Sequence, residues 1–208
     1  MKKIPLIETR EASFERGGRQ IATDISIKLY EGDIYFIKGK NGSGKTTFLR
    51  CLLGFVPTYS GKIIWFGEEV FPSINFNYPA VAWLGHLNAL KSVFSVQENL
   101  NFYANIWRVS DEKVRNAIET LSFEEYLQFP VSWLSAGEKR RLSLIRLIFC
   151  PAKIWLLDEP SSFLDDFNKM KLENIMKNHI SNGGSIVCST HDSIEISNSK
   201  TLFLGKEY

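Results

Sequence analysis

The sequence has no long apolar run, few cysteines and no large excess of charge of either sign. No apolar stretch approaches the roughly 18 to 20 residues that a membrane-spanning helix needs, so we expect a chain that does not cross a bilayer. Its 25 Lys and Arg residues against 23 Asp and Glu exclude a nucleic-acid binder that depends on a strongly basic face. The opening segment, MKKIPLIETREASFERGG, has no apolar run of about 7 to 15 residues, which predicts no secretory signal and a cytosolic chain.

The three cysteines, Cys51, Cys150 and Cys188, lack the C-x-x-C spacing of a zinc or redox site. Each lies among apolar residues, so we expect free, buried thiols. Hydrophobic residues make up 44% of the 208 residues and charged residues 23%, which is typical of a globular protein. Neither an internal repeat nor a low-complexity linker is visible. The length suits one generous domain, or a core with one inserted subdomain.

Hydrophobic patterns predict strands and helices that alternate along the chain. Apolar alternation and short apolar runs predict strands at 25–29, 34–37, 62–66, 81–84, 154–157 and 185–189. Amphipathic patterns predict helices at 48–53, 96–107, 111–121, 136–149 and 165–180.

A strand–helix–strand order with a short connector makes a parallel sheet, so we expect the α/β class. The predicted fold is a P-loop NTPase core with a mostly parallel sheet and an antiparallel β part near the N-terminus. We expect residues 1–208 to form a single domain, with 1–85 and 150–208 as the core and 86–149 as an inserted helical subdomain. Within helix 136–149, Leu142, Ile145 and Phe149 share an apolar face, and Lys139, Arg140 and Arg141 are predicted to lie outside it.

A glycine-rich segment follows the predicted strand 34–37 directly and leads into a helix. It reads Gly39-Lys40-Asn41-Gly42-Ser43-Gly44-Lys45-Thr46-Thr47 and matches G-x-x-x-x-G-K-[ST]. Glycines let the backbone wrap a polyphosphate closely, Lys45 reaches its β and γ oxygens, and Thr46 ligates Mg²⁺. The alternative is an ordinary glycine-rich turn, but the strand before it and the helix after it favour a nucleoside triphosphate site.

Two carboxylates, Asp158 and Glu159, end the apolar strand 154–157. At the carboxyl edge of a parallel sheet, Asp158 is expected to hold Mg²⁺. Because side chains alternate along a strand, Glu159 points differently and is a candidate general base for the attacking water. The alternative, a merely polar strand exit, is disfavoured by the glycine-rich segment upstream.

The segment Leu134-Ser135-Ala136-Gly137-Glu138 precedes that acidic strand. Taken alone, it also describes a helix N-cap with a carboxylate in the first turn. The spacing from Ser135 to Asp158, 158 − 135 = 23 residues, resembles the ATP-binding cassette family, whose signature LSGGQ precedes its acidic strand. Ser162-Phe163-Leu164-Asp165 resembles the D-loop of that family, and Thr190-His191-Asp192 resembles its switch histidine. A lone histidine such as His179, on a predicted helix, is interpreted as structural.

The resemblance covers nearly the whole chain and implies an ATPase with ATP and Mg²⁺ as its ligands. In the family two cassettes pair head to tail, which implies a homodimer here. Ser135 and the N–H of Gly137 would then donate to the γ-phosphate bound by the glycine-rich loop of the partner copy. Asp165 would belong to the D-loop, and His191 would orient the water against Glu159.

Three residues depart from the family pattern. Ala136 replaces a glycine of the signature and is small enough to be tolerated. Glu138 replaces its glutamine and places a carboxylate near the partner's triphosphate, which should lower affinity unless Lys139 or Arg140 compensates. His86 stands where the Q-loop glutamine is expected, because Asn99 follows it by 99 − 86 = 13 residues. We interpret His86 as a coupling residue more than as a metal ligand.

Three segments together resemble one subfamily, the ATP-binding subunit of the heme exporter of cytochrome c maturation: Leu84-Gly85-His86, Glu98–Tyr103 and Leu134–Gly137. This resemblance implies integral membrane subunits as partners and a peripheral location on the cytoplasmic face of the inner membrane. Residues 87–94, here called the docking loop, are the expected contact with those subunits; the alternative is ordinary packing on the helices. Other open functions are a subunit of another exporter or importer and a soluble ATPase of the same family.

The base of the nucleotide has one candidate partner. Cassettes stack adenine on an aromatic residue upstream of the glycine-rich loop, and Phe14 precedes Gly39 by 39 − 14 = 25 residues. The alternative is a phenylalanine of the core in the first strand.

Overall fold

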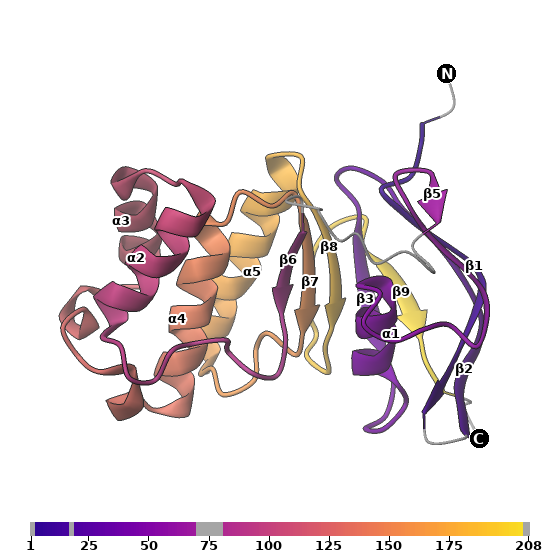
Figure 1. Cartoon of the computed structure of the whole chain (residues 1–208), viewed down its shortest axis with the longest axis horizontal. Helices are drawn as coiled ribbons and strands as arrows, with labels where there is room; N and C mark the ends of the chain where they lie inside the picture. Colours follow the sequence, from indigo (N-terminus) through magenta and orange to yellow (C-terminus); the bar gives the residue numbers. More distant parts are fainter. Residues whose placement is uncertain (1–2, 17–18, 70–80, 206–208) are drawn as a thin grey trace.

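The computed structural model describes residues 3–16, 19–69 and 81–205. Two sheets and five α-helices make up this part of the chain (Figure 1). The strands are β1 (Ile7–Arg16), β2 (Arg19–Leu29), β3 (Ile34–Lys38), β4 (Ser60–Trp65), β5 (Glu68–Glu69), β6 (Val81–Leu84), β7 (Ile154–Asp158), β8 (Ser185–Ser189) and β9 (Lys200–Phe203). The helices are α1 (Lys45–Leu52), α2 (Val96–Trp107), α3 (Asp111–Thr120), α4 (Ala136–Phe149) and α5 (Asp166–Ser181), with short 3₁₀ turns at Glu124–Tyr126 and Val131–Trp133.

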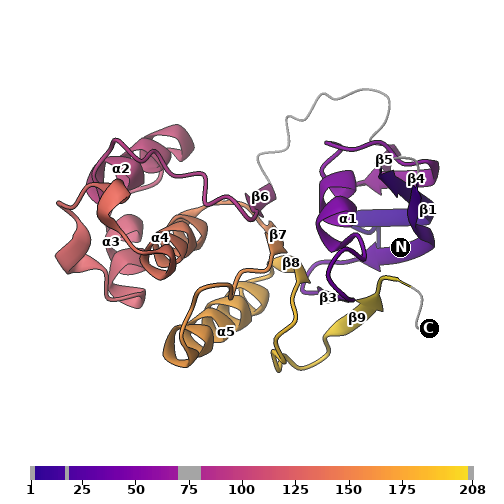
Figure 2. The ribbon, with the colours of Figure 1, turned by 90° about the horizontal axis from the view of Figure 1, so that it is seen from below.

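A parallel sheet of order β6-β7-β8-β3-β9 forms the centre of the molecule. Every residue of β7 and β8 is buried, as expected for apolar strands that are covered on both faces. Helices α1 and α5 lie on opposite faces of this sheet (Figure 2). The sheet therefore places the ends of its central strands at one protected edge.

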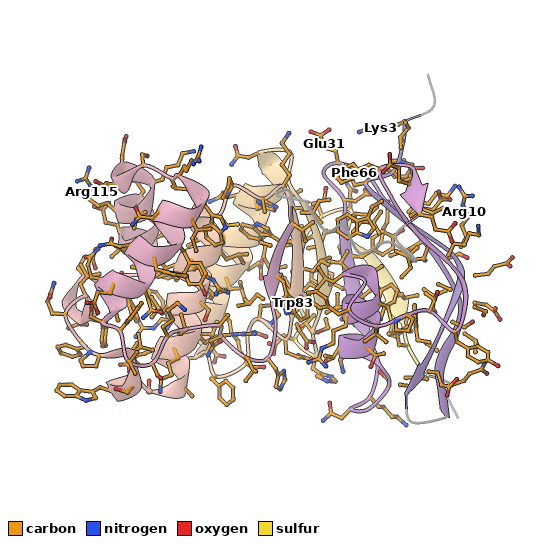
Figure 3. The ribbon with its side chains drawn as sticks, viewed as in Figure 1. Lys3, Arg10, Glu31, Phe66, Trp83 and Arg115 are labelled. Carbon is orange, nitrogen blue, oxygen red and sulfur yellow. The ribbon has the colours of Figure 1, made fainter. Side chains whose placement is uncertain are left out.

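An antiparallel sheet of order β2-β1-β4-β5 lies at one end of the molecule, and α2, α3 and α4 lie at the other (Figure 1). Arg10 of β1 and Arg115 of α3 point outward at these two ends, whereas Trp83 of β6 lies between them (Figure 3). Helix α1 packs between the antiparallel sheet and the parallel sheet, in contact with β1, β7 and β8. One hydrophobic cluster fills that space, and a second runs from the parallel sheet into the three helices.

The predicted α/β class, the mostly parallel sheet and the antiparallel β part near the N-terminus are confirmed. The structure adds β1, β5 and β9, which the hydrophobic pattern did not predict. Helices α2, α3 and α4 follow β6 and precede β7 in the chain; their assignment to a separate subdomain, 86–149, stays a prediction. Among the described residues, no helix combines the length and the hydrophobicity that crossing a bilayer requires.

All three cysteines are free. Cys51 and Cys188 are buried and Cys150 is half-buried, so the predicted free thiols are present. Burial raises the pKa of the Cys51 thiol to about 12, which leaves it protonated and unreactive near neutral pH.

Candidate active site

Four neighbouring strands of the parallel sheet end at the same edge. In sheet order, His86 follows β6, Asp158 ends β7, His191 follows β8, and the glycine-rich loop (residues 39–47) follows β3. Because parallel strands run in one direction, segments that are far apart in sequence meet at their carboxyl ends. The polar residues that end or follow these apolar strands are therefore brought together at one edge of the sheet.

A cavity of about 440 Å³ opens at this edge. This volume is within the roughly 300–1,000 Å³ of small-ligand sites. Its lining comes from the glycine-rich loop, the strand ends and β2: Ile21, Asn41, Gly42, Ser43, Gly44, Lys45, Thr46, Thr47, His86, Asp158, Glu159, Ser162 and His191. Of the loop residues, Gly39 and Lys40 lie outside this lining, and Lys40 is exposed.

The glycines of the loop adopt conformations that other residues strongly disfavour. Gly44, the N-cap of α1, has a φ of 97°, and Gly39 has a φ of 153°. A Cβ at Gly39 would collide with the carbonyl oxygen of Leu204, and a Cβ at Gly44 would collide with Ile21. Gly44 also has no side chain to cap α1, so no N-cap side chain competes with an anion for the N–H groups of its first turn.

A hydrogen bond joins the first turn of α1 to the end of β7. The hydroxyl of Thr46 donates to Oδ2 of Asp158 at 2.8 Å, and the Ser189 hydroxyl donates to Oδ1 of Asp158 at 2.6 Å. Asp158 is 1% exposed, so its carboxylate is held in one orientation. Hydroxyl and carboxylate oxygens are ligands that Mg²⁺ prefers. Among the described residues, no group of three or more His, Cys, Asp and Glu is placed to hold a metal ion.

The Glu159 carboxylate is held within reach of two basic side chains. Its Oε1 lies 3.3 Å from Nε2 of His191 and 3.6 Å from Nζ of Lys45. Its backbone has a φ of 48°, and its N–H donates to the Ser189 carbonyl and hydroxyl oxygens, both at 3.0 Å. A left-handed non-glycine residue is costly, and such strain is commonly found at functional sites.

Lys45 connects the glycine-rich loop to the end of β8. Its Nζ donates to the carbonyl of Gly39 at 3.0 Å and lies 2.9 Å from Nε2 of His191. The same His191 nitrogen lies 3.0 Å from Oδ1 of Asn41. The Lys45 side chain is 8% exposed and that of His191 is 51% exposed, so a buried ammonium group lies next to a half-exposed imidazole at the cavity wall.

The signature-like segment lies on the surface at the start of α4. Ser135 and Ala136 are exposed, Gly137 and Glu138 are half-buried, and Leu134 is buried. Ser135 is the N-cap: its Oγ accepts the N–H of Glu138 at 3.3 Å, and Oε2 of Glu138 accepts the N–H of Ser135 at 2.7 Å. The backbone hydrogen bond from Ser135 lowers the pKa of Glu138. This capping box leaves the hydroxyl proton of Ser135 available to a ligand.

The signature-like segment and the cavity of the glycine-rich loop share no lining residue in the described part of the chain. A separate, smaller depression of about 160 Å³ brings Ser135, Gly137 and Glu138 together with Phe163 and Asp165. Asp165 is the exposed N-cap of α5, and its Oδ1 accepts the N–H of Asn168 at 2.8 Å. One chain therefore carries the two sets of residues at two separate places.

His86 lies at the rim of the main cavity, where its Nδ1 is 4.0 Å from Oδ2 of Asp158. Its side chain is 71% exposed. The docking loop follows, and its Leu87 and Val93 are 88% and 85% exposed. The loop is anchored from below by Asn99, a buried residue of α2 whose side chain exchanges hydrogen bonds with the backbone of Lys91.

The expected role of Phe14 in stacking the base is wrong. Phe14 is 1% exposed and packs in the core against Phe48, with ring centroids 5.4 Å apart. Neither face of its ring is open to a ligand, because the residue points inward from β1. The structure instead places Ile21 of β2 beside Gly44 at the cavity wall. Ile21 was missed because one apolar residue near a turn carries no distinctive signal.

Arg140 was also misplaced by the sequence pattern. It was predicted to lie on the polar side of its helix, near enough to compensate Glu138, but it is 2% exposed and turns toward the ends of β6 and β7. The cation beside Glu138 is Arg141, which lines the same depression and contributes to its lowered pKa.

Comparison with known proteins agrees with this geometry. The family model described as "ABC transporter" matches residues 22–162. A relative from Hahella chejuensis, named "Cytochrome c biogenesis ATP-binding export protein CcmA", is 32% identical over 94% of this chain and 93% of its own length. A protein of the same name from Maricaulis maris is 35% identical over 93% of this chain and 89% of its own length.

Solved structures show the same fold. An ATP-binding protein of a putative ABC transporter from Pyrococcus furiosus superposes with a TM-score of 0.82 and 22% identity, over 95% of this chain and 96% of that one. The family match spans the glycine-rich loop, the signature-like segment and the acidic strand end, and the relatives align over almost the entire chain. This chain belongs to the ABC transporter family.

Proposed function

We propose that this chain hydrolyses ATP for a membrane transport complex, the heme exporter of cytochrome c biogenesis. The names printed for its relatives, which are cytochrome c biogenesis ATP-binding export proteins, support the assignment to that pathway. The site supports the reaction. Its buried Lys45 ammonium, its free helix N-terminus and its oxygen ligands suit a triphosphate with a divalent cation.

One observation carries the proposal: the 2.8 Å hydrogen bond between Thr46 and Asp158. It brings the hydroxyl that follows the phosphate-binding lysine to the acidic end of β7, so that two oxygen ligands converge at the start of α1. A bound Mg²⁺ would supply positive charge to the phosphate oxygens at this point. Thr46 and Asp158 are the residues that would hold it.

Glu159 and His191 act on the water molecule that attacks the γ-phosphate. Glu159 accepts a proton from the attacking water as general base, and its left-handed backbone aims the carboxylate into the cavity. His191, 3.3 Å away, orients that water and donates toward the γ-phosphate. Lys45 binds the β and γ oxygens, and the N–H groups of residues 42–46 complete the phosphate cradle.

A second copy of the chain completes the site. Ser135 and Gly137 lie in a depression separate from the P-loop cavity, so within one copy they have no part in that cavity. In a head-to-tail homodimer each copy would close its signature over the triphosphate of the other. The free hydroxyl proton of Ser135 and the positive end of α4 would then donate to the γ-phosphate.

The docking loop is the proposed contact with integral membrane subunits, at the cytoplasmic face of the inner membrane. Its exposed Leu87 and Val93 are suited to an apolar partner surface. His86 would couple that contact to the site, since it lies between the docking loop and Asp158.

The proposal is tested in a strain that lacks this chain. We expect the strain to lose holo-cytochrome c, and we expect the wild-type gene, but not a Lys45→Ala gene, to restore it. The tagged chain should copurify with membrane proteins whose complex hydrolyses ATP. Normal holo-cytochrome c in the deletion strain, together with ATPase activity in the purified complex, would assign the chain to another ABC exporter or importer.

A further inference from the structure

One buried cation joins three parts of the molecule that the proposed mechanism treats separately. Arg140 lies on α4, five residues after the signature serine, and is 2% exposed. All five N–H groups of its guanidinium are used. Its acceptors are the carbonyl oxygens of Pro160 (3.0 Å), Gly85 (2.9 Å), Asp158 (2.9 Å) and Glu159 (2.6 Å), and Oδ1 of Asn88 (3.1 Å).

These acceptors are backbone and amide oxygens rather than carboxylates. Burying a cation is costly, and desolvation lowers the pKa of Arg140 to about 10, although the nearby charges of Asp158 and Glu159 oppose that shift. The group remains charged at neutral pH. Five hydrogen bonds to one buried cation hold the guanidinium and its acceptors in fixed relative positions. If any acceptor moved away, an N–H group would be left unpaired in the interior.

The acceptors come from two sides. Three carbonyls belong to the segment that ends β7 and carries the proposed metal ligand and general base. Gly85 and Asn88 belong to the segment that leaves β6, on either side of His86 and Leu87. Nη1 donates only to acceptors after β6, whereas Nη2 and Nε donate only to carbonyls at the end of β7. The rigid plane of the guanidinium therefore spans the docking loop and the catalytic segment.

The backbone of Glu159 is held from both directions. Its N–H donates to Ser189, and its carbonyl accepts from Arg140. Its φ of 48° requires such support, since an unsupported glutamate would relax out of the left-handed region. The position of the carboxylate thus depends on where Nη2 of Arg140 lies.

We propose that Arg140 is a positioning residue that carries movements of the docking loop to the backbone of Glu159. A partner that shifts Gly85 and Asn88 would rotate the guanidinium and move the general base relative to the bound phosphate. This inference rests on the proposed function. It adds a defined mechanical connection between the membrane contact and the chemical step, with the signature helix α4 as its support.

The first test uses Arg140→Lys in the purified full chain. A lysine has a single nitrogen on a flexible stem and does not span both sets of acceptors. We expect kcat for ATP hydrolysis to fall about 10- to 100-fold, the effect of a misplaced reacting group. KM and the stoichiometry of ATP binding should stay at wild-type values, because Arg140 does not line the phosphate cavity. A role in folding alone would lower the ATP-binding stoichiometry and leave kcat per bound site unchanged.

The second test is a double-mutant cycle with Asn88→Ala, which removes the one acceptor that the docking loop supplies and leaves the Gly85 carbonyl in place. We expect a few-fold loss of kcat in the wild-type background and no further loss in Arg140→Lys, because the two residues act through one connection. Ser143→Ala is the matched control. Its hydroxyl also donates to the docking loop, at the Asn88 carbonyl (3.3 Å), and otherwise to the Lys139 carbonyl of its own helix (2.9 Å). Its effect should be the same in both backgrounds.

The outcomes separate this inference from the function on which it rests. Wild-type kcat in Arg140→Lys, or an equal Asn88→Ala effect in both backgrounds, overturns the inference alone. If Arg140→Lys does not fold, wild-type kcat in Asn88→Ala overturns it. Equal ATP turnover by the wild-type and Lys45→Ala chains would contradict the proposed function as well.

Discussion

Glu159 and His191 lie at the ends of two adjacent parallel strands, with Oε1 of one 3.3 Å from Nε2 of the other. The two residues are 32 positions apart (191 − 159), and the register of β7 with β8 brings them together: Asp158 pairs with Ser189, just before each of them. A carboxylate and an imidazole held at this distance can contact the same water molecule, the carboxylate as its general base and the imidazole as the group that orients it. The strand pairing therefore builds the hydrolytic half of the proposed site.

The variant Glu159→Gln should retain ATP binding and lose hydrolysis by about 10²-fold or more, because the water loses its general base. Without hydrolysis, the closed homodimer should accumulate in saturating ATP. Light scattering after addition of ATP measures this shift from monomer to dimer. A variant that remains monomeric while ATP is bound would count against a site completed by the partner copy.

The variant Lys45→Ala should lose ATP binding, because it removes the buried ammonium group that we propose binds the phosphates. Equilibrium binding of a fluorescent ATP analogue measures the loss. Lys40→Ala is the matched control, since Lys40 belongs to the same loop but is exposed and does not line the cavity. An equal loss of ATP binding in both variants would mean that the substitutions act by destabilising the loop, and not by removing a phosphate contact of Lys45.

The sequence predicted the residues that follow apolar runs, because the carboxyl ends of parallel strands must meet. Asp158 and Glu159 were found in this way, whereas Lys45 came from the glycine-rich motif and His191 from the resemblance to a switch histidine. The structure brings all four together at one cavity. Phe14 was misassigned because its distance from the loop says nothing about which face of β1 it occupies.

Arg140 is a second residue whose burial the sequence pattern did not predict. Helical periodicity places it among basic residues, whereas the acceptors that make its burial tolerable come from two segments elsewhere in the chain, 85–88 and 158–160. Strand β9 was missed for a similar reason: only residues 200 and 202 of this edge strand are partly buried, so its apolar pattern is weak.

Glu138 is expected to contribute to stability through the capping box. The variant Glu138→Gln should lower the free energy of unfolding by about 0.5 kcal/mol, because a neutral amide accepts the N–H of Ser135 less strongly and loses the interaction with the positive end of α4. The same change removes a negative charge next to the proposed γ-phosphate contact. We therefore expect tighter ATP-dependent dimerisation together with lower stability, measured by urea unfolding and by light scattering. If Glu138→Gln instead lowered both the free energy of unfolding and the ATP-dependent dimerisation, the proposed effect of the charge on dimerisation would be contradicted.

His179 should make the fold sensitive to acid. Its ring stacks on Trp155 with centroids 3.7 Å apart, Nε2 lies 3.1 Å from the carbonyl of Lys153, and burial lowers its pKa to about 4. In the unfolded chain a histidine has a pKa of about 6.5. Between pH 6.5 and 4 the unfolded state therefore binds the proton first, and the free energy of unfolding falls as the pH falls.

The expected loss is about 1 to 2 kcal/mol across that interval, since the partial exposure of the ring reduces the full effect of the pKa shift. His179→Phe keeps a ring against Trp155 and removes the titrating group. Its stability at pH 7 should fall modestly, because the contact with Lys153 is lost, while its loss between pH 7 and pH 4.5 should be smaller than in the wild type. Asn174→Ala, an exposed and uncharged position on the same helix, is the control and should keep the wild-type slope. Urea unfolding at pH 7 and pH 4.5 measures this loss of unfolding free energy. An equal loss in the wild type and in His179→Phe would show that another group controls the acid sensitivity.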